Sequence, residues 1–288
     1  MAQSISLKTC EARIFCDTLA EKEEKMRIVN LGSGSKGNST FIHAGEMRVL
    51  IDVGFSVQEV SRRLELIGEK SENIDAVIIT HEHIDHIRGF ITFLKKYNAK
   101  GYVPEEIYDE VLVKAPEEVK NKVGKVTDNH FWLDQMLFIP LDLPHDSKVC
   151  KGYCLEYNHK KVTFMTDLGY FPLNLLQTIN GSSLIYIESN HDKKMLRECH
   201  YPSIVKARIG GESGHLSNEQ AAQVILELAK SGTKYFVLSH ISENSNTIEK
   251  AYLTCARAVE NAGYVLEKDI FIRYSRQDRP GNNFKFGD

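Results

Sequence analysis

The stretch from Thr80 to His86 reads THEHIDH and gathers three imidazoles and two carboxylates within seven residues. It directly follows the apolar run Ile74 to Ile79, whose β-branched residues are typical of a buried strand. On an extended segment His81 and His83 point the same way, so both rings can reach one cation. A solvated polar loop is the alternative, but this density of ligand side chains favours a metal site.

The segment that follows has the spacing of a helix, with apolar residues at Ile87, Phe90, Ile91 and Leu94. A helix that begins there would turn Asp85 and His86 toward a second cation beside the first. Imidazole and carboxylate suit Zn²⁺ or Mn²⁺, and three or more protein ligands with one open position are typical of a catalytic site. We therefore expect two divalent metal ions.

The pattern H-x-H-x-D-H between a strand and a helix resembles the metallo-β-lactamase superfamily, whose members carry it at a one- or two-metal hydrolytic centre. The resemblance implies an α+β fold, the αββα four-layer sandwich. Three further segments resemble the YycJ/WalJ-like branch, bacterial proteins described as exonuclease-like: ESNHD at residues 188–192, GHLSN at 214–218 and LSHISEN at 238–244. Together the matching segments cover residues 26 to 276.

The resemblance also implies a set of metal ligands: His81, His83 and His145 for one ion, Asp85, His86 and His240 for the other, and Asp167 between them. Taken alone, the Pro-His-Asp sequence around His145 would indicate a turn, and Asp167 at a strand end would indicate a helix cap. Their order and spacing behind the leading motif favour the metal site instead.

The activity implied is hydrolysis of a nucleic-acid phosphodiester, with DNA favoured over RNA and an exonuclease as the first hypothesis. Two cations would lower the pKa of a shared, bridging water, so that hydroxide forms near neutral pH. We expect Asp85 to orient that hydroxide. His215 is the candidate to contact the phosphate or to protonate the leaving oxygen.

Further candidates for substrate binding surround these residues. The glycine-rich loop from Gly32 to Ser39 lacks the ending of a P-loop, and its composition indicates a tight turn. In the family that it resembles, the loop lies beside the metals, where a phosphate could be met. The candidates are Asn38, Ser39, His191, Ser217 and the basic residues Lys193, Lys194 and Arg197. Such a basic run is either a solvated face or a track for a nucleic-acid backbone.

Two of these candidates have structural alternatives. Ser217 with Gln220 forms a capping-box pattern that would explain the serine without a substrate. His191 could instead support the site together with Glu188.

Other functions remain open from the sequence. The same metals could hydrolyse a small thioester, lactam or cyclic phosphodiester, or the chain could be a metal-stabilised regulatory or scaffold protein with a vestigial site. A complete ligand set argues against the last. The formal net charge of −3 excludes a protein that coats nucleic acid by bulk charge, so any polyanion must be held locally.

We expect one hydrolase domain at residues 26–276, preceded by a poorly ordered extension at 1–25 and followed by an irregular polar tail at 277–288. No apolar run approaches the ~20 residues of a membrane span, and the start lacks a signal-peptide pattern, so we expect a cytoplasmic protein without a membrane partner. The six cysteines show no disulfide framework. Cys150 and Cys154 could form a metal clip, but one face of a strand explains them better.

Overall fold

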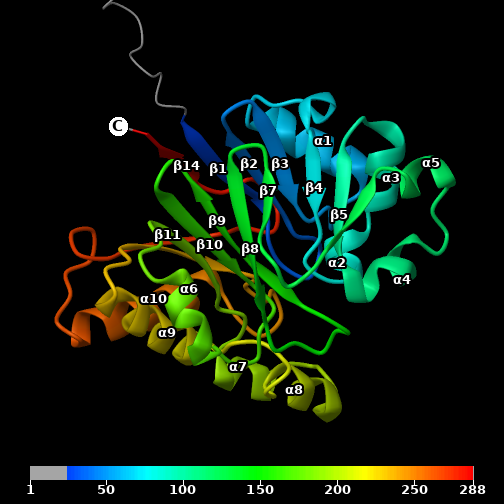
Figure 1. Cartoon of the computed structure of the whole chain (residues 1–288). Helices are drawn as coiled ribbons and strands as arrows, with labels where there is room; N and C mark the ends of the chain where they lie inside the picture. The colour runs from blue at the N-terminus through cyan, green and yellow to red at the C-terminus, as the bar shows by residue number, and fades with distance from the viewer. Residues whose placement is uncertain (1–24, 288) are drawn as a thin grey trace, which may run out of the picture.

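Two seven-stranded sheets pack face to face in the computed structural model, which describes residues 25–287 (Figure 1). The first sheet has the order β14-β1-β2-β3-β4-β5-β6. Its strands are β1 (Met26–Gly32), β2 (Ser39–Ala44), β3 (Met47–Ile51), β4 (Ala76–Ile78), β5 (Lys100–Pro104), β6 (Val123–Val126) and β14 (Asn283–Phe286). The second sheet has the order β13-β12-β11-β10-β9-β8-β7. Its strands are β7 (Phe131–Leu133), β8 (Met136–Asp142), β9 (Lys151–Tyr157), β10 (Lys160–Met165), β11 (Leu184–Glu188), β12 (Tyr235–Ser239) and β13 (Phe271–Tyr274).

Helices cover the outer face of each sheet (Figure 1). Those of the first half of the chain are α1 (Val57–Leu66), α2 (Ile84–Ile87), α3 (Phe90–Lys96), α4 (Tyr108–Leu112) and α5 (Glu117–Lys120), with 3₁₀ turns η1 (Ser71–Asn73) and η2 (Glu105–Ile107). Those of the second half are α6 (Leu176–Ile179), α7 (Lys193–Glu198), α8 (Ser203–Ile209), α9 (Asn218–Lys230) and α10 (Ile248–Asn261), with the 3₁₀ turn η3 (Leu173–Leu175). The predicted αββα sandwich is confirmed.

Strand direction changes in the same way in both sheets. Strands β1 to β3 pair antiparallel, whereas β3 to β6 pair parallel. In the second sheet β7 to β10 are antiparallel and β10 to β13 parallel. Parallel strands deliver their carboxyl ends to one edge, where ligand sites of α/β sheets form.

The alternating burial of β1 explains how one strand serves two layers. Met26 and Ile28 join the cluster between the two sheets, and Val29 and Leu31 join the cluster under the outer helices of the first sheet. Because both faces are covered, nearly every residue of the strand is buried. Each fully buried aliphatic side chain contributes about 1.5–3 kcal/mol to folding.

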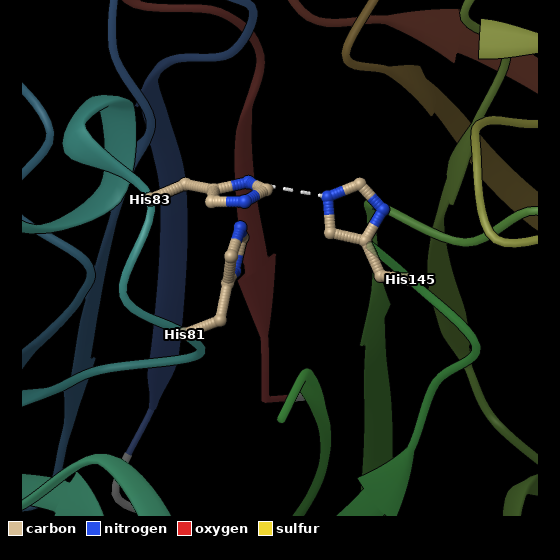
Figure 2. Close-up of side chains that lie close together, drawn as sticks. All are labelled: His81, His83 and His145. Atoms are coloured by element: carbon tan, nitrogen blue, oxygen red, sulfur yellow. Dashed lines mark hydrogen bonds between the residues drawn. The ribbon is translucent and has the colours of Figure 1, made fainter. Parts of the chain in front are cut away.

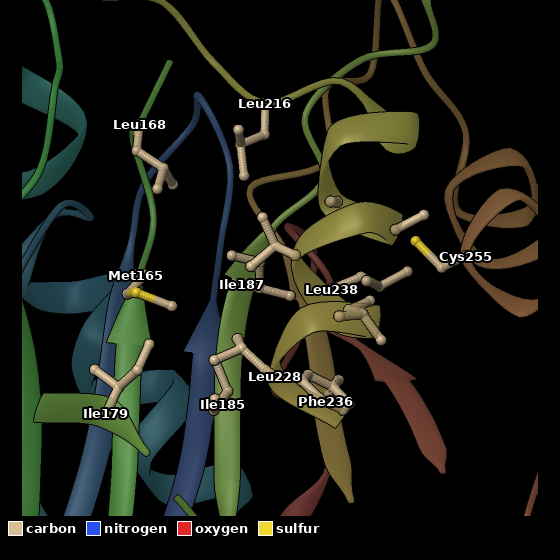
Figure 3. Close-up of a cluster of buried hydrophobic side chains, with 14 of the residues drawn as sticks. Met165, Leu168, Ile179, Ile185, Ile187, Leu216, Leu228, Phe236, Leu238 and Cys255 are labelled. Carbon is tan, nitrogen blue, oxygen red and sulfur yellow. The ribbon is translucent and has the colours of Figure 1, made fainter. Parts of the chain in front are cut away.

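The second outer layer consists chiefly of α9 and α10. In Figure 3 the side chain of Leu228 on α9 points toward Ile185 and Phe236 of the sheet, and Cys255 on α10 packs from the far side. The Ser217–Gln220 capping box predicted at the start of α9 is confirmed, because the side-chain oxygen of each residue accepts a hydrogen bond from the backbone N–H of the other.

Two local expectations were wrong. The helix expected after His86 is broken into α2 and α3, since the Gly89 N–H donates to Val53 O and a Cβ on Gly89 would approach Phe55 O to 2.3 Å. The tail expected to be irregular after residue 276 contains β14, because its backbone completes the edge of the first sheet by antiparallel pairing with β1. The extension predicted at residues 1–25 lies outside the described residues, apart from residue 25.

Among the helices of residues 25–287, none has the length and apolar character needed to span a bilayer.

Candidate metal centre

The predicted ligands come together at the edge where strands of both sheets end. His81 and His83 lie on the loop after β4, and His145 lies on the loop between β8 and β9. Figure 2 shows the first two rings directed from one sheet toward His145 on the other. His145 Nε2 lies 3.3 Å from His83 Nδ1, and one nitrogen of each of the three residues falls within 4.8 Å of the others.

The remaining predicted ligands form overlapping groups beside this one. Ligand atoms again lie within 4.8 Å of one another in the sets Asp85–His86–His240, His81–His86–Asp167 and Asp167–Glu188–His215–His240. Asp167 therefore lies between the two predicted trios, as a bridging carboxylate would. The geometry fits the seven predicted ligands, whose roles stay a prediction.

The chemistry of these groups is suited to cations. Three atoms in the centre, His81 Nε2, Asp167 Oδ2 and His240 Nε2, are buried and have no hydrogen-bond partner in the described part of the chain. A buried polar atom without a partner costs about 1–3 kcal/mol. Imidazole nitrogen and carboxylate oxygen are ligands of Zn²⁺ and Mn²⁺, so bound cations would satisfy all three atoms.

Three of the seven non-glycine residues with positive φ in the described part of the chain lie at strand ends that supply the centre. Asp52, Asp167 and His240 have φ angles of 64°, 64° and 54°, and they follow β3, β10 and β12. Left-handed backbone at a residue other than glycine costs on the order of 1–3 kcal/mol and clusters at functional sites. The turn after each strand aims its side chain at the shared edge.

Two residues that do not belong to the predicted ligand set fix His86. Asp52 Oδ2 lies 2.8 Å from His86 Nδ1, and the Thr80 hydroxyl lies 3.2 Å from the same nitrogen. The backbone N–H of Thr80 donates to Asp52 Oδ1 at 2.9 Å. Asp52 directly follows β3, in the sequence Ile-Asp-Val-Gly of residues 51–54.

Glu188 is the functional residue that the sequence indicated least. It is fully buried at the end of β11, and its Oε1 lies 2.9 Å from His215 Nδ1 and 2.8 Å from His240 Nδ1. Its Oε2 accepts the backbone N–H groups of Leu168 and Leu216. One carboxylate thus orients two histidines that come from distant segments.

The charges of the centre favour cation binding. Burial lowers the pKa of His81 well below its usual range and keeps the ring neutral, as a metal ligand must be. Burial opposes charge on His86 too, but Asp52 and Asp167 raise its pKa to about 10. For the Asp167 carboxyl, His240 and His86 outweigh the effect of burial and hold its pKa well below the usual range. Asp167 is therefore ionised and attracts cations, and a cation that binds His86 displaces the proton that the raised pKa of this ring retains.

The predicted substrate residues divide into two groups. Asn38 Nδ2 reaches the centre, 2.9 Å from His86 Nε2 and 3.3 Å from Asp85 Oδ2. The Ser39 hydroxyl instead donates to Asp52 O, and Ser217 is the cap of α9.

Burial separates the remaining candidates. Ser39, Ser217 and His191 are 1%, 0% and 2% exposed, so the expectation that they meet the substrate is not supported by their accessibility. Burial lowers the pKa of His191 to about 4, so the ring is neutral. The basic residues are exposed on α7: Lys193, Lys194 and Arg197.

Comparison with known proteins places the chain among hydrolases. Residues 47–241 match the family described as the beta-lactamase superfamily domain. The chain is 30% identical over 241 residues to the exodeoxyribonuclease WalJ of Streptococcus pneumoniae serotype 2, strain D39, covering 81% of this chain and 87% of that protein. It is 28% identical over 243 residues to the exodeoxyribonuclease YycJ of Bacillus anthracis, covering 81% and 89%.

A solved structure shares the fold over nearly the whole chain. The metallo-beta-lactamase fold protein YhfI from Bacillus subtilis superposes with a TM-score of 0.68 at 13% identity, covering 91% of this chain and all of that one. At this identity the likeness concerns the fold alone.

Proposed function

The chain belongs to the metallo-β-lactamase superfamily, and from that premise we propose that it is a metal-dependent phosphodiesterase of nucleic acid, specifically a DNA exonuclease. The observation that carries the proposal is the convergence of the seven predicted ligands, with three buried ligand atoms that lack a hydrogen-bond partner among the described residues. The names of the two relatives, which match over most of their length, support nucleic acid over a small molecule as the substrate. We assign the activity to residues 26–276 and to the cytoplasm.

The residues proposed to hold two divalent ions, Zn²⁺ or Mn²⁺, are His81, His83 and His145 on one side, Asp85, His86 and His240 on the other, and Asp167 between them. When bound, such ions lower the pKa of water and neutralise charge on a phosphodiester. The support lies in the distances within each trio.

Asp85 and His215 are the residues proposed to act on the reacting atoms. The Asp85 carboxylate is 18% exposed and lies 3.3 Å from Asn38 Nδ2, so one of its oxygens can accept a hydrogen bond from the attacking water. The Nδ1 of His215 is engaged by Glu188, which leaves Nε2 for the leaving oxygen. The His215 side chain is 16% exposed, which leaves a path to the substrate.

The exposed residues Lys193, Lys194 and Arg197 on α7 are proposed to follow the nucleic-acid backbone. Reversal of all three charges should weaken binding to long DNA and flatten its salt dependence by about one unit of slope per lost phosphate contact.

The function is tested with end-labelled single- and double-stranded DNA and RNA, incubated with the protein loaded with Zn²⁺ or Mn²⁺. We expect mononucleotides to be released from DNA ends, and Asp85→Asn to abolish this release. Asp109→Asn on α4 is the matched control for the change of charge. Hydrolysis of a small thioester or lactam without any cleavage of nucleic acid would refute the proposal.

A further inference from the structure

Arg208 lies at the rim of the centre, in a position that two short contacts define. It is the penultimate residue of α8, and its Nη1 lies 3.2 Å from Asp146 Oδ2. The other oxygen of Asp146 lies 3.3 Å from His145 Nε2, the nitrogen that also faces His83 Nδ1. The guanidinium is thus connected to the first predicted metal trio through a single carboxylate.

The backbone of Arg208 is held against the same region. A Cβ on Gly214 would approach Arg208 O to 2.1 Å, so only glycine lets the loop pack this closely on α8. The His215 N–H donates to Ile209 O at 2.9 Å, and Gly214 O lies 3.1 Å from His145 Nδ1. The end of α8 is therefore tied to both rim histidines, His145 and His215, whose rings lie 5.0 Å apart.

Arg208 remains available to a ligand despite its contact with Asp146. Its side chain is 62% exposed, and a guanidinium carries five N–H donors in a planar fork that matches a phosphate. The ammonium group of Lys206, on the same helix, donates a hydrogen bond to Arg197 O and so joins α8 to α7. Of these two residues, Arg208 is the one directed to the centre.

Arg208 offsets negative charge at the rim of the centre. The centre already contains the buried carboxylates of Asp167 and Glu188, and Asp146 adds a further negative charge at its rim. An anionic substrate that approaches this rim would be repelled by Asp146 alone. With Arg208 held on that carboxylate, the rim presents hydrogen-bond donors to the incoming anion.

We propose that Arg208, positioned by Asp146, binds the phosphate group that flanks the scissile phosphodiester. This inference rests on the proposed nucleic-acid substrate and adds a residue that selects a polynucleotide over an isolated phosphodiester. Asp146 is a positioning residue in this arrangement.

The test compares Arg208→Gln with Arg62→Gln in the metal-loaded full chain. Arg62 is the matched control, because its side chain is 51% exposed and, like Arg208, pairs with a carboxylate, here that of Glu59 on α1. Binding is measured by fluorescence anisotropy with a phosphorothioate oligodeoxythymidylate. We expect Arg208→Gln to weaken binding about tenfold, the effect of one charge-assisted hydrogen bond, and to reduce the salt slope by about one unit. Arg62→Gln should bind as the wild type does.

Kinetics and a double variant separate the alternatives. The loss in kcat/KM should be several-fold larger for an oligonucleotide than for bis(nitrophenyl) phosphate, which has no flanking phosphate. Asp146→Asn combined with Arg208→Gln should stay weak; recovery of binding would mean that Arg208 only neutralises Asp146, and would overturn the proposal.

Two further results would also count against it. Equal losses on both substrates, or no loss at all, overturn the assignment of Arg208 while leaving the proposed function intact. A wild-type protein that hydrolyses the aryl ester but neither binds nor cleaves DNA overturns both.

Discussion

Asp52 Oδ2 lies 2.8 Å from His86 Nδ1, and both side chains are almost completely buried. The carboxylate can only accept a hydrogen bond, so it holds a proton on Nδ1, and Nε2, which Asn38 Nδ2 approaches to 2.9 Å, is the nitrogen left to bind metal. Asp52 thus determines the tautomer of His86 without belonging to the predicted ligand set. The contact links the residue that follows β3 to helix α2.

We predict that Asp52→Asn lowers the affinity for Zn²⁺ about 10- to 100-fold, the usual effect of losing such a supporting group. An amide can present its NH₂ to His86 and drive the imidazole proton onto Nε2, the nitrogen that must bind metal. Competition with a chromogenic chelator measures the affinity. Asp134→Asn is the matched control, because Asp134 is exposed and has a similar φ of 53°. Equal affinities for both variants would contradict the assigned role.

A second prediction concerns metal removal. We expect close to two divalent ions per chain in freshly purified protein, and a lower melting temperature after treatment with a chelator. Ligand atoms such as His81 Nε2 then lose their partners. At a free metal concentration 100 times the Kd, binding stabilises the fold by about 2.7 kcal/mol.

Elemental analysis and differential scanning fluorimetry provide the measurements. Asp85→Ala should bind less metal yet keep the circular dichroism spectrum of the wild type, since Asp85 belongs to none of the three apolar clusters that hold the layers. Absence of bound metal, together with no metal-dependent change in melting temperature, would refute the metal site.

Glu188→Gln should destabilise the protein by about 1–3 kcal/mol. The carboxylate now accepts hydrogen bonds from N–H groups on both of its oxygens, and the NH₂ of an amide would face one of these donors with a donor. Urea unfolding measures the loss. Glu227→Gln is the control and should change little, because the Glu227 side chain on α9 is 44% exposed and pairs only with the exposed Lys230. A Glu188→Gln variant as stable as the wild type would show that these contacts are not made in solution.

Acid should weaken the fold through Glu59 on α1. Hydrogen bonds from Arg62 and Arg63 lower the pKa of Glu59 from 4.5 to about 2, although burial of the carboxyl group acts to raise it. Because the folded pKa lies below the unfolded one, the carboxylate contributes stability above pH 4.5 and loses it as the pH falls toward 2. Glu59→Gln should therefore reduce stability at neutral pH and match the wild type in acid, as measured by urea unfolding. A difference that persists in acid would contradict this ion-pair origin.

Local sequence was sufficient for the parts of the centre that one strand and its following loop contain. His81 and His83 are near neighbours in the chain, so spacing alone indicated a shared cation, and the helical spacing that follows turned Asp85 and His86 toward a second one. Glu188 meets His215 and His240 only because β11 lies between β10 and β12. Strand order is not written in any local pattern, so the sequence, which offered Glu188 only as a partner of His191, did not reveal these contacts.

Burial was equally hard to foresee. The sequence around Ser39 and Ser217 offered hydroxyls to a phosphate, but neighbouring backbone takes both. The strand β14 was missed because it has only four residues and forms by pairing with β1 at the opposite end of the described chain. Long-range pairing of this kind depends on the assembled sheet edge.

The last prediction is that His215 serves the substrate and not the metals. His215 Nδ1 is engaged by Glu188 Oε1 at 2.9 Å, whereas its distance to Asp167 Oδ1 is 3.7 Å. His215→Ala should therefore retain its full metal content, while cleavage slows by about 10²- to 10⁴-fold, the scale of one acid–base group. The loss of rate should be smaller for a nitrophenyl phosphodiester, whose leaving group needs no proton.

Metal analysis and single-turnover kinetics on both substrates measure the two effects. The control is His200→Ala, because His200 is an exposed histidine after α7. Loss of metal in His215→Ala would mean that His215 is a metal ligand, and the assignment of His240 would then be in question. Unchanged cleavage would mean that the loop of His215 serves only to begin α9.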